Sequence, residues 1–431
     1  MPQLVGRESE LAELRAAYAN AAAACAPCVL LVSGPAGIGK SALIRAFEES
    51  IDERSLVLRA GGYPFDRLIP RSLVERVPNL FERIEQAARE APAVLLVDDA
   101  HYADDESIAG IAAMTQRLAE RPILIVLTLD DDDERALPIE AQATIRLHGL
   151  DSRAAGALAR ASFAQASPDV IDAIVANAHG VPYEVVTIAR AAARRGEHEP
   201  TAVDRSARIS IARELAALPA PERMTLQMLA LLPEPVELEL LDAAAPEFPV
   251  DHALTASAIT ETIAMKIPLR RRIIGAMERR GMRGVRDRLA LAEQFLAVAD
   301  RPLAQRTLLD LALAAHEQQL FRLLTWAGEH HLELGEPPDD SFIEFYSAFF
   351  TALMETQAYA RAESIAAHAL SEAQRRGLAG LGSLAAQLVR AQWSVDRRDA
   401  AKASYERYSR AFDDPRDAQA LRDAAPWLIL R

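Results

Sequence analysis

The sequence predicts an α/β domain followed by an all-α region. Over residues 1–150, short apolar runs alternate with helical patterns, which indicates a parallel sheet covered by helices on both faces. A glycine-rich loop follows the first of these runs and leads into a helix. Beyond residue 150 the apolar residues recur mainly at helical spacing. A chain of 431 residues is too long for one hydrophobic core and suggests two to four domains.

The composition argues against several functional classes. Half of the residues are hydrophobic, 26% are charged, and the formal net charge is −14. Such an acidic balance disfavours general binding to nucleic acids or anionic membranes. The sequence shows neither an apolar run of about 18 residues, which a membrane-spanning helix needs, nor the pattern of a secretory signal. We therefore expect a cytoplasmic location and no membrane association.

The only two cysteines, Cys25 and Cys28, form a C-x-x-C pair just before the first strand. This spacing occurs in redox-active dithiols and in halves of zinc sites. A four-thiolate site would need a second pair, and no thioredoxin-like surroundings follow. The simpler interpretation is two small, semi-buried residues at the start of a strand.

The strongest functional signal is a phosphate-binding loop. Gly34, Gly39, Lys40 and Ser41 match the pattern G-x-x-x-x-G-K-[ST] between the apolar run Val29–Val32 and a helix. In such a loop, backbone N–H groups and the helix N-terminus surround the phosphates. Lys40 would reach the β- and γ-phosphates, and Ser41 would bind Mg²⁺. We therefore predict an ATP or ADP site with Mg²⁺, formed by Gly34, Pro35, Ala36, Gly37, Ile38, Gly39, Lys40, Ser41 and Ala42.

Two carboxylates follow a second buried strand. The apolar run from Ala93 to Val97 ends in Asp98 and Asp99, which is the form of a Walker B strand. A carboxylate at the end of such a strand can bind the Mg²⁺ held by Ser41. The next residue can orient or deprotonate the attacking water. We assign Asp98 to the metal and Asp99 to the water.

These motifs together resemble those of AAA+-like and STAND ATPases. The segment Val94–Asp104 looks like the D-D-x-H-x-A-D signature of the large LuxR-type ATP-binding regulators, and His101 is its histidine. Val-Gly-Arg-Glu precedes the phosphate loop and Gly-x-Pro follows the Walker B strand, in the order of the family. Taken alone, His101 is more simply a hydrogen-bonded structural histidine.

The resemblance implies roles for residues outside the phosphate loop. Val5, Gly6 and Arg7 would line the adenine pocket, and Pro182 of the helical lid would pack on the adenine. Without the resemblance, Arg7 could equally be a solvated arginine at a helix start, and Gly-x-Pro is also a common turn between helices.

The sensor position of the family falls at the end of the strand Ile123–Leu129. Thr128 would there contact the γ-phosphate, and we count it with Lys40, Asp98 and Asp99 as a catalytic candidate. Relatives often carry arginine two residues later, where this chain has Asp130. A last strand, Thr144–Leu147, would complete the sheet.

The resemblance divides the chain into a P-loop NTPase core (1–150), a helical lid (151–200), a winged-helix-like regulatory domain (201–300) and a tetratricopeptide-like helical repeat (301–431). The polar segment 196–205 would separate the lid from the regulatory domain. Arginines are concentrated in residues 266–288. That segment could bind nucleic acid or an acidic partner, or it could be a solvated helix face.

Two departures from the LuxR-type regulators affect the functional prediction. The span from Lys40 to Asp98 is shorter than usual, and the DNA-binding helix-turn-helix has no counterpart, so direct DNA binding is not expected. The leading hypothesis is a slow ATPase that acts as a signalling switch, with a protein partner on the helical repeat and nucleotide-dependent self-association. The alternatives are a nucleotide-stabilised scaffold without enzymatic activity and a steady-turnover ATPase.

Overall fold

The computed structural model describes residues 4–63, 65–131, 137–231, 266–412 and 414–424. The chain forms two compact units, Met1–Leu269 and Arg270–Arg431. The first unit holds a five-stranded parallel sheet followed by helices, and the regular elements described in the second unit are all helices. Among the described residues, none of the helices has the length and apolar character that crossing a bilayer would require.

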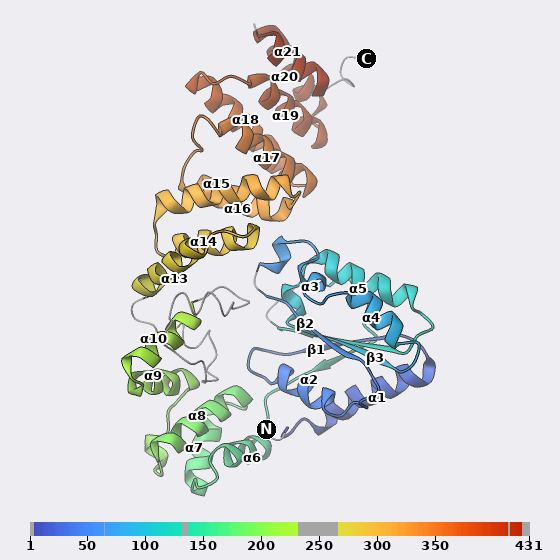
Figure 1. The fold of residues 1–431 in the computed structure, drawn as a ribbon, viewed down its shortest axis with the longest axis vertical. Helices are drawn as coiled ribbons and strands as arrows, with labels where there is room; N and C mark the ends of the chain where they lie inside the picture. The colour runs from blue at the N-terminus through green and yellow to red at the C-terminus, as the bar shows by residue number, and fades with distance from the viewer. Residues whose placement is uncertain (1–3, 64, 132–136, 232–265, 413, 425–431) are drawn as a thin grey trace. The chain divides into compact units, whose positions relative to one another are not determined.

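The sheet has the strand order β2-β3-β4-β1-β5 and all of its pairings are parallel (Figure 1). Its strands are β1 (Cys28–Ser33), β2 (Val57–Gly61), β3 (Ala93–Asp98), β4 (Ile123–Leu129) and β5 (Ala143–Arg146). Strands β1, β3, β4 and β5 each lie within a few residues of the apolar run that predicted them. The central strands β3 and β4 are buried almost along their whole length, as expected for a sheet covered on both faces.

Helices cover both faces of the sheet (Figure 1). On one face α1 (Glu8–Ala24) and α2 (Lys40–Glu48) pack around the fully buried Leu14, Leu43 and Phe47. The other face is covered by α3 (Ser72–Glu75), α4 (Leu80–Ala87) and α5 (Asp105–Arg117). Parallel strands place all of their carboxyl ends at one edge, so β1, β3 and β4 deliver their following residues to the same place.

The helices after the sheet form a core of their own. They are α6 (Ser152–Ser162), α7 (Pro168–Ala178) and α8 (Pro182–Arg195), all within residues 151–200, where the sequence predicted a helical lid. Val170, Ile174 and Ile188 are buried between them. The next helices are α9 (Ala207–Ala217) and α10 (Ala220–Leu229), and Pro219 between them is the N-cap of α10. Part of the expected winged-helix-like region, residues 232–265, lies outside the described residues.

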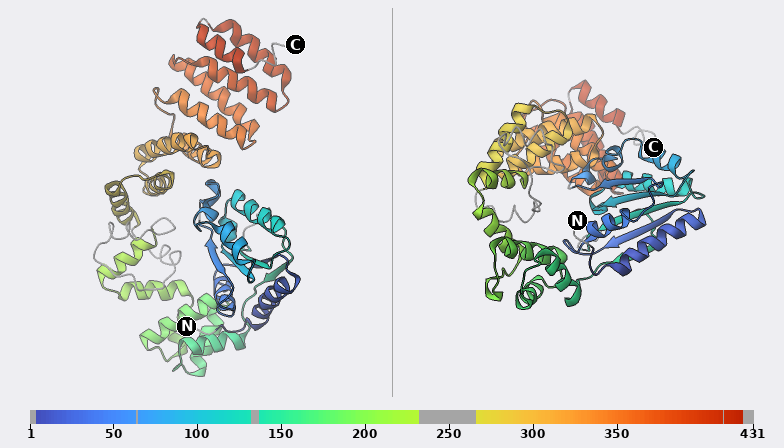
Figure 2. Two further views of the ribbon diagram at one scale, coloured as in Figure 1. Left: turned by 45° about the vertical axis from the view of Figure 1, so that its right-hand side comes forward. Right: turned by 60° about the horizontal axis from the view of Figure 1, so that its bottom comes forward.

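The second unit is a row of packed helices, each in contact with its neighbours in the chain (Figure 2). They are α13 (Lys266–Arg280), whose first residues belong to the first unit, α14 (Val285–Ala297), α15 (Arg301–Glu317), α16 (Phe321–Leu334), α17 (Phe342–Glu355), α18 (Tyr359–Arg376), α19 (Leu381–Ser394), α20 (Arg398–Ala411) and α21 (Pro415–Ala424). Phe342, Phe345, Tyr346 and Phe349 of α17 are fully buried in its core. The last described helix, α21, packs on α19.

Candidate nucleotide site

The phosphate loop lies between β1 and α2, at the carboxyl edge of the sheet. Gly37 has φ +75° and Gly39, the N-cap of α2, has φ +101°, which residues with a Cβ rarely adopt. No side chain caps α2. The first N–H groups of an α-helix have no acceptor within the helix, and in α2 no capping side chain replaces it. Donors at the positive end of a helix suit a phosphate group, as the motif predicted.

Lys40 is buried, and its ammonium group is turned back onto the loop. Its Nζ donates to the carbonyl oxygens of Gly34 at 2.6 Å and Pro35 at 3.2 Å. Phosphate oxygens carry charge and are better acceptors for an ammonium than carbonyls are. Ser41 in the first turn of α2 and Asp98 at the end of β3 add a hydroxyl and a carboxylate. These oxygen donors fit Mg²⁺.

Thr128 connects the two residues predicted to form the Walker B pair. Strand β4 lies between β1 and β3, so Thr128 stands between the strand that feeds the phosphate loop and the strand that carries Asp98. Its Oγ1 donates to Oδ1 of Asp98 at 2.6 Å and accepts the N–H of Asp99 at 2.7 Å. Because Thr128 is fully buried, these bonds hold the Asp98 carboxylate and the backbone of Asp99 in place. Its predicted contact with the γ-phosphate stays a prediction.

Asp99 lies in an environment that disfavours its charged form. Burial, and then the charge of Asp98, raise the pKa of Asp99 above its ordinary value, although His101 and Lys40 oppose the shift. Its backbone is left-handed, with φ +49°. A carboxylate with a raised pKa is a stronger base towards a water molecule. This property suits the role predicted for Asp99.

Arg7 forms hydrogen bonds that connect the N-terminal segment to the phosphate loop and to the residues after β5. Its guanidinium donates to the carbonyl of Ile38 in the phosphate loop at 3.1 Å and to that of His148 after β5, and it pairs with Glu10 at 2.9 Å. Arg7 is 5% exposed, so the interpretation as a solvated arginine is wrong. A Cβ added to Gly6 would lie 2.5 Å from the Cβ of Ala154 in α6.

The remaining adenine-side candidates lie near these contacts. Val5 packs against the core of α6, α7 and α8. The predicted contacts of Val5, Gly6 and Arg7 with adenine stay predictions.

The turn before α8 contacts the phosphate loop directly. Tyr183 donates its N–H to the carbonyl of Gly37 at 3.2 Å, and a Cβ on Gly39 would lie 3.9 Å from Cγ of Pro182. The N–H of Leu150 donates to the carbonyl of Gly180 at 2.7 Å, which ties the turn to the end of the sheet domain. Pro182 is therefore brought to the phosphate loop, and its contact with adenine stays a prediction.

The structure also assigns a role to Asp104, the last aspartate of the D-D-x-H-x-A-D segment. Its 2% exposed carboxylate caps α5 through the N–H of Ser107 at 2.8 Å. It also accepts from the N–H of Arg71 at 2.7 Å and from Ser72 Oγ at 3.3 Å. The spacing Asp-x-x-Ser before an apolar helical pattern is an N-cap signal that could have revealed the capping role. The bonds to residues 71 and 72 carry no sequence signal.

The structure also shows the environments of the cysteines, of His101 and of the arginine-rich segment. Cys25 is an exposed free thiol and Cys28 a partly buried one. His101 is buried, and its carbonyl accepts from Nε of Arg67 at 2.6 Å. In the arginine-rich segment, Arg280 pairs with Asp287. Of the described residues, no group of three or more His, Cys, Asp and Glu is arranged to hold a metal ion.

Comparison with known families supports the nucleotide assignment for the N-terminal part. Residues 3–77 match the family model of the AAA ATPase domain, a range that includes the Val-Gly-Arg segment and the phosphate loop. The match implies ATP binding by this domain. It covers a minor part of the chain. No curated protein matches the sequence.

Several solved structures resemble the chain at low identity. A signal transduction ATPase with numerous domains (STAND) and a tetratricopeptide repeat sensor, from Pyrococcus horikoshii, has a TM-score of 0.46 and 16% identity, covering 99% of this chain and 75% of its own. Cdc6p from Pyrobaculum aerophilum has a TM-score of 0.38 and 18% identity, with 64% and 88% covered. The Aeropyrum pernix Orc1 protein, solved in complex with DNA, has a TM-score of 0.37 and 17% identity, covering 62% of this chain and 85% of its own. TM-scores below 0.5 support no functional assignment, which rests on the site and on the family model.

Proposed function

We propose that the chain is an ATP-binding signalling switch of the STAND type that hydrolyses ATP slowly. The observation that carries the proposal is the junction of three parts at one edge of the sheet. The phosphate loop, the Walker B pair held by Thr128 and the turn of Pro182 and Tyr183 meet there. A nucleotide bound at this junction would contact both the sheet domain and α8.

The proposed chemistry is hydrolysis of the γ-phosphate. Lys40 and the N–H groups of the loop would hold the phosphates, and Mg²⁺ bound by Ser41 and Asp98 would neutralise the charge on them. Asp99 would orient the water and accept its proton. Asp99 is a shorter arm than the glutamate of many hydrolytic relatives, which agrees with slow turnover.

The proposed switch follows from differential binding. ATP has a γ-phosphate that ADP lacks, so the two nucleotides can stabilise different arrangements of the sheet domain and the lid. A tenfold shift between two arrangements needs about 1.4 kcal/mol, which one charge-assisted hydrogen bond can supply. The helical second unit would receive a protein partner, in a transcriptional or other signalling pathway.

Light scattering tests the proposal. The molar mass is measured with ADP–Mg²⁺ and then with a non-hydrolysable ATP analogue. We expect the mass to depend on the nucleotide, and we expect Lys40→Ala to abolish this dependence by weakening binding at least about tenfold. Lys402→Ala, which removes an exposed lysine of α20, is the matched control. An unchanged mass with both bound nucleotides would contradict assembly-type switching.

One feature favours a nucleotide-stabilised scaffold as the second candidate. Asp130 stands where related ATPases often have the sensor arginine, which removes a positive charge from the γ-phosphate side. If the protein is a scaffold, its molar mass would not depend on the nucleotide. Lys40→Ala would then only lower the thermal stability of the protein. The same variant therefore separates the two functions.

A further inference from the structure

The backbone of the Walker B turn is held from both sides of β3. This strand lies between β4 and β2, and Gly61 at the end of β2 is paired with Asp98. The N–H of the next residue, Gly62, donates to the carbonyl of Asp98 at 2.9 Å. From the β4 side, Thr128 accepts the N–H of Asp99. The turn after β3 is therefore bonded to the chain of both neighbouring strands.

Gly62 also packs directly on the backbone of Asp99. A Cβ at Gly62 would lie 2.3 Å from the carbonyl oxygen of Asp99 and 3.0 Å from Cβ of Tyr102. A side chain at this position would have to displace the turn by about 1 Å to restore an ordinary contact distance. At Gly61 the corresponding Cβ would lie 3.9 Å from the carbonyl oxygen of Asp98, which is an ordinary contact. Of these two adjacent glycines, only Gly62 is required by the packing.

A buried ion pair holds Gly62 in this position. Asp66 is 1% exposed and accepts the N–H of Tyr63 at 2.8 Å. Arg76 donates through Nη1 to Oδ2 of Asp66 at 2.7 Å, and its Nη2 binds the other carboxylate oxygen. The same Nη1 reaches the carbonyl of Gly61 at 3.0 Å, and the guanidinium lies 4.6 Å from the ring centroid of Tyr63. Because Gly61 and Tyr63 flank Gly62, these charge-assisted contacts fix it from both sides.

The same segment contains two residues in an unfavourable backbone conformation. Phe65 has φ +73° and Arg71 has φ +61°. A left-handed backbone is unfavourable for residues with a Cβ and persists where surrounding contacts determine it. One such contact is the bond from the N–H of Arg71 to the buried Asp104, five residues after Asp99. The segment is therefore fixed against the chain that follows the Walker B strand.

We propose that residues 62–76 form a brace that positions Asp99 for catalysis. Gly62 sets the place of the Asp99 backbone, and the Asp66–Arg76 pair holds Gly62. The inference rests on the proposed function and adds the residues that fix the geometry of its base. The phosphate loop follows β1, which β4 separates from β3. Changes in the brace should therefore affect the turnover of ATP and leave its affinity unchanged.

Alanine at the two adjacent glycines tests the brace. Gly62→Ala should lower kcat for ATP about a hundredfold, because a displacement of about 1 Å in a catalytic group can cost that much. Gly61→Ala keeps the carbonyl that Arg76 contacts and is the matched control, which should leave kcat unchanged. Neither glycine has a positive φ, so alanine adds no left-handed strain at either position. The Kd of a fluorescent ATP analogue should be the same in both variants.

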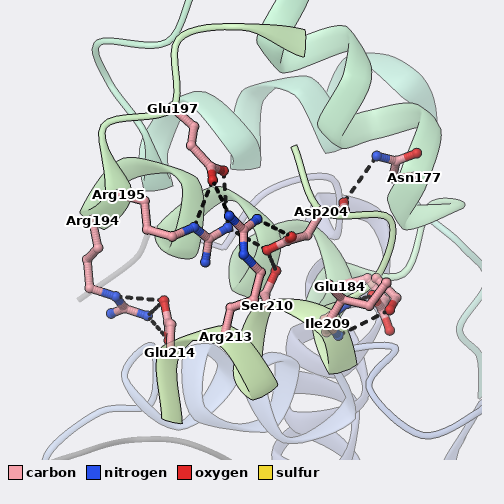
Figure 3. Close-up of polar contacts among 12 residues, drawn as sticks. Asn177, Glu184, Arg194, Arg195, Glu197, Asp204, Ile209, Ser210, Arg213 and Glu214 are labelled. Atoms are coloured by element: carbon pink, nitrogen blue, oxygen red, sulfur yellow. Dashed lines mark hydrogen bonds and ion pairs between the residues drawn. The ribbon is translucent and has the colours of Figure 1, made fainter. Parts of the chain in front are cut away.

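The ion pair is tested against a second buried aspartate of the first unit. Asp204, whose side chain is 3% exposed, pairs with Arg195 and accepts from Arg213 Nη1 at 2.7 Å (Figure 3). Arg76→Ala and Arg213→Ala each remove a guanidinium from a buried carboxylate, so both should lower the free energy of unfolding. Only Arg76→Ala should also lower kcat, by about tenfold or more, with an unchanged Kd. Arg76→Lys should restore part of the lost turnover.

The outcomes separate the brace from the proposed function. If the native protein hydrolyses ATP and Gly62→Ala has the kcat of Gly61→Ala, the brace alone is wrong. If Gly62→Ala does not fold, the arginine variants decide, and equal kcat values for Arg76→Ala and Arg213→Ala would overturn the brace. A Kd that rises as much as kcat falls would also overturn it. If the native protein hydrolyses ATP no faster than Lys40→Ala, the proposed hydrolysis and the brace are both wrong.

Discussion

The Walker B pair illustrates how one buried hydroxyl organises a site. Thr128 donates to the Asp98 carboxylate and accepts from the backbone N–H of Asp99, so the positions of both residues depend on a residue from a neighbouring strand. Burial and the charge of Asp98 raise the pKa of Asp99. The folded state therefore disfavours the ionised Asp99, and this unfavourable contribution is present above its folded-state pKa. Ionised Asp99 therefore lowers the stability of the folded protein, and the proposed chemistry needs this residue as a base.

We predict opposite effects of Asp99→Asn on stability and turnover. At neutral pH the free energy of unfolding should rise because the disfavoured charge is gone, while ATP turnover should fall roughly a hundredfold or more. In the native protein, turnover should fall in acid through a pKa above the ordinary 3.8 of aspartate as Asp99 is protonated. This acid limb should be absent from the variant.

Urea unfolding measures the predicted change in the free energy of unfolding, and a pH–rate profile measures the predicted change in ATP turnover. Glu140→Gln, at an exposed position of the same unit, is the control and should change neither quantity. An Asn variant that keeps the same acid limb would show that another group titrates.

At the scale of secondary-structure elements, two N-cap aspartates differ in their burial and in their hydrogen bonds. Asp104 and Asp151 are both N-caps with carboxylates that accept a backbone N–H, at 2.8 Å from Ser107 and 2.7 Å from Ala154. Asp104 is buried and also holds the segment at Arg71, whereas Asp151 is exposed. The same N-cap signal in the sequence thus corresponds to a buried residue with additional hydrogen bonds in one case and to an exposed cap in the other.

Asp104→Ala should therefore destabilise the first unit by about 3 kcal/mol, because several buried donors lose their acceptor. Asp151→Ala, the matched control, should cost only about 1 kcal/mol, the usual effect of an exposed cap. Urea unfolding of both variants measures the difference. Equal losses would show that the additional bonds of Asp104 contribute nothing.

The contact between the lid turn and the phosphate loop can be tested with two glycines. A Cβ at Gly37 would lie 2.9 Å from the Cβ of Tyr183, whereas Gly196, the C-cap of α8, has no atom within 4 Å. Both have positive φ, so an alanine strains both backbones similarly. Gly37→Ala should in addition displace the turn and weaken nucleotide binding about tenfold. Gly196→Ala should bind normally in a fluorescent-nucleotide titration; equal affinities would contradict the coupling.

For the whole molecule, two compact units predict two unfolding transitions. Nucleotide binds the first unit, so a saturating ATP analogue at a hundred times its Kd should stabilise that transition by about 2.7 kcal/mol and leave the other in place. Gly328→Ala should lower only the second transition, because its Cβ would lie 2.6 Å from Cδ2 of Phe349. Scanning calorimetry measures both. A single transition that shifts as one would contradict independent units.

The sequence predicted the parts of this protein that depend on neighbours along the chain. Apolar periodicity located the strands β1, β3 and β4 and most helices, because burial on one face repeats with the period of the element. The phosphate loop was also predictable, since glycines, lysine and serine must stand in a fixed order for N–H groups to surround a phosphate. The strand order and the pairing of β1 with β4 were not predictable, because they join distant segments.

The remaining features required the tertiary structure. Arg7 has the same neighbours in sequence whether it is solvated or bonded to Ile38 and His148, and only the fold brings those carbonyls to it. The polar segment 196–205 looked like a linker because it is rich in charged residues and contains a proline. Its Asp204 finds Arg213 on α9 only after the chain has turned back along α8. Periodicity and motifs record local requirements, whereas the burial and pairing of a charge are decided by contacts between distant segments.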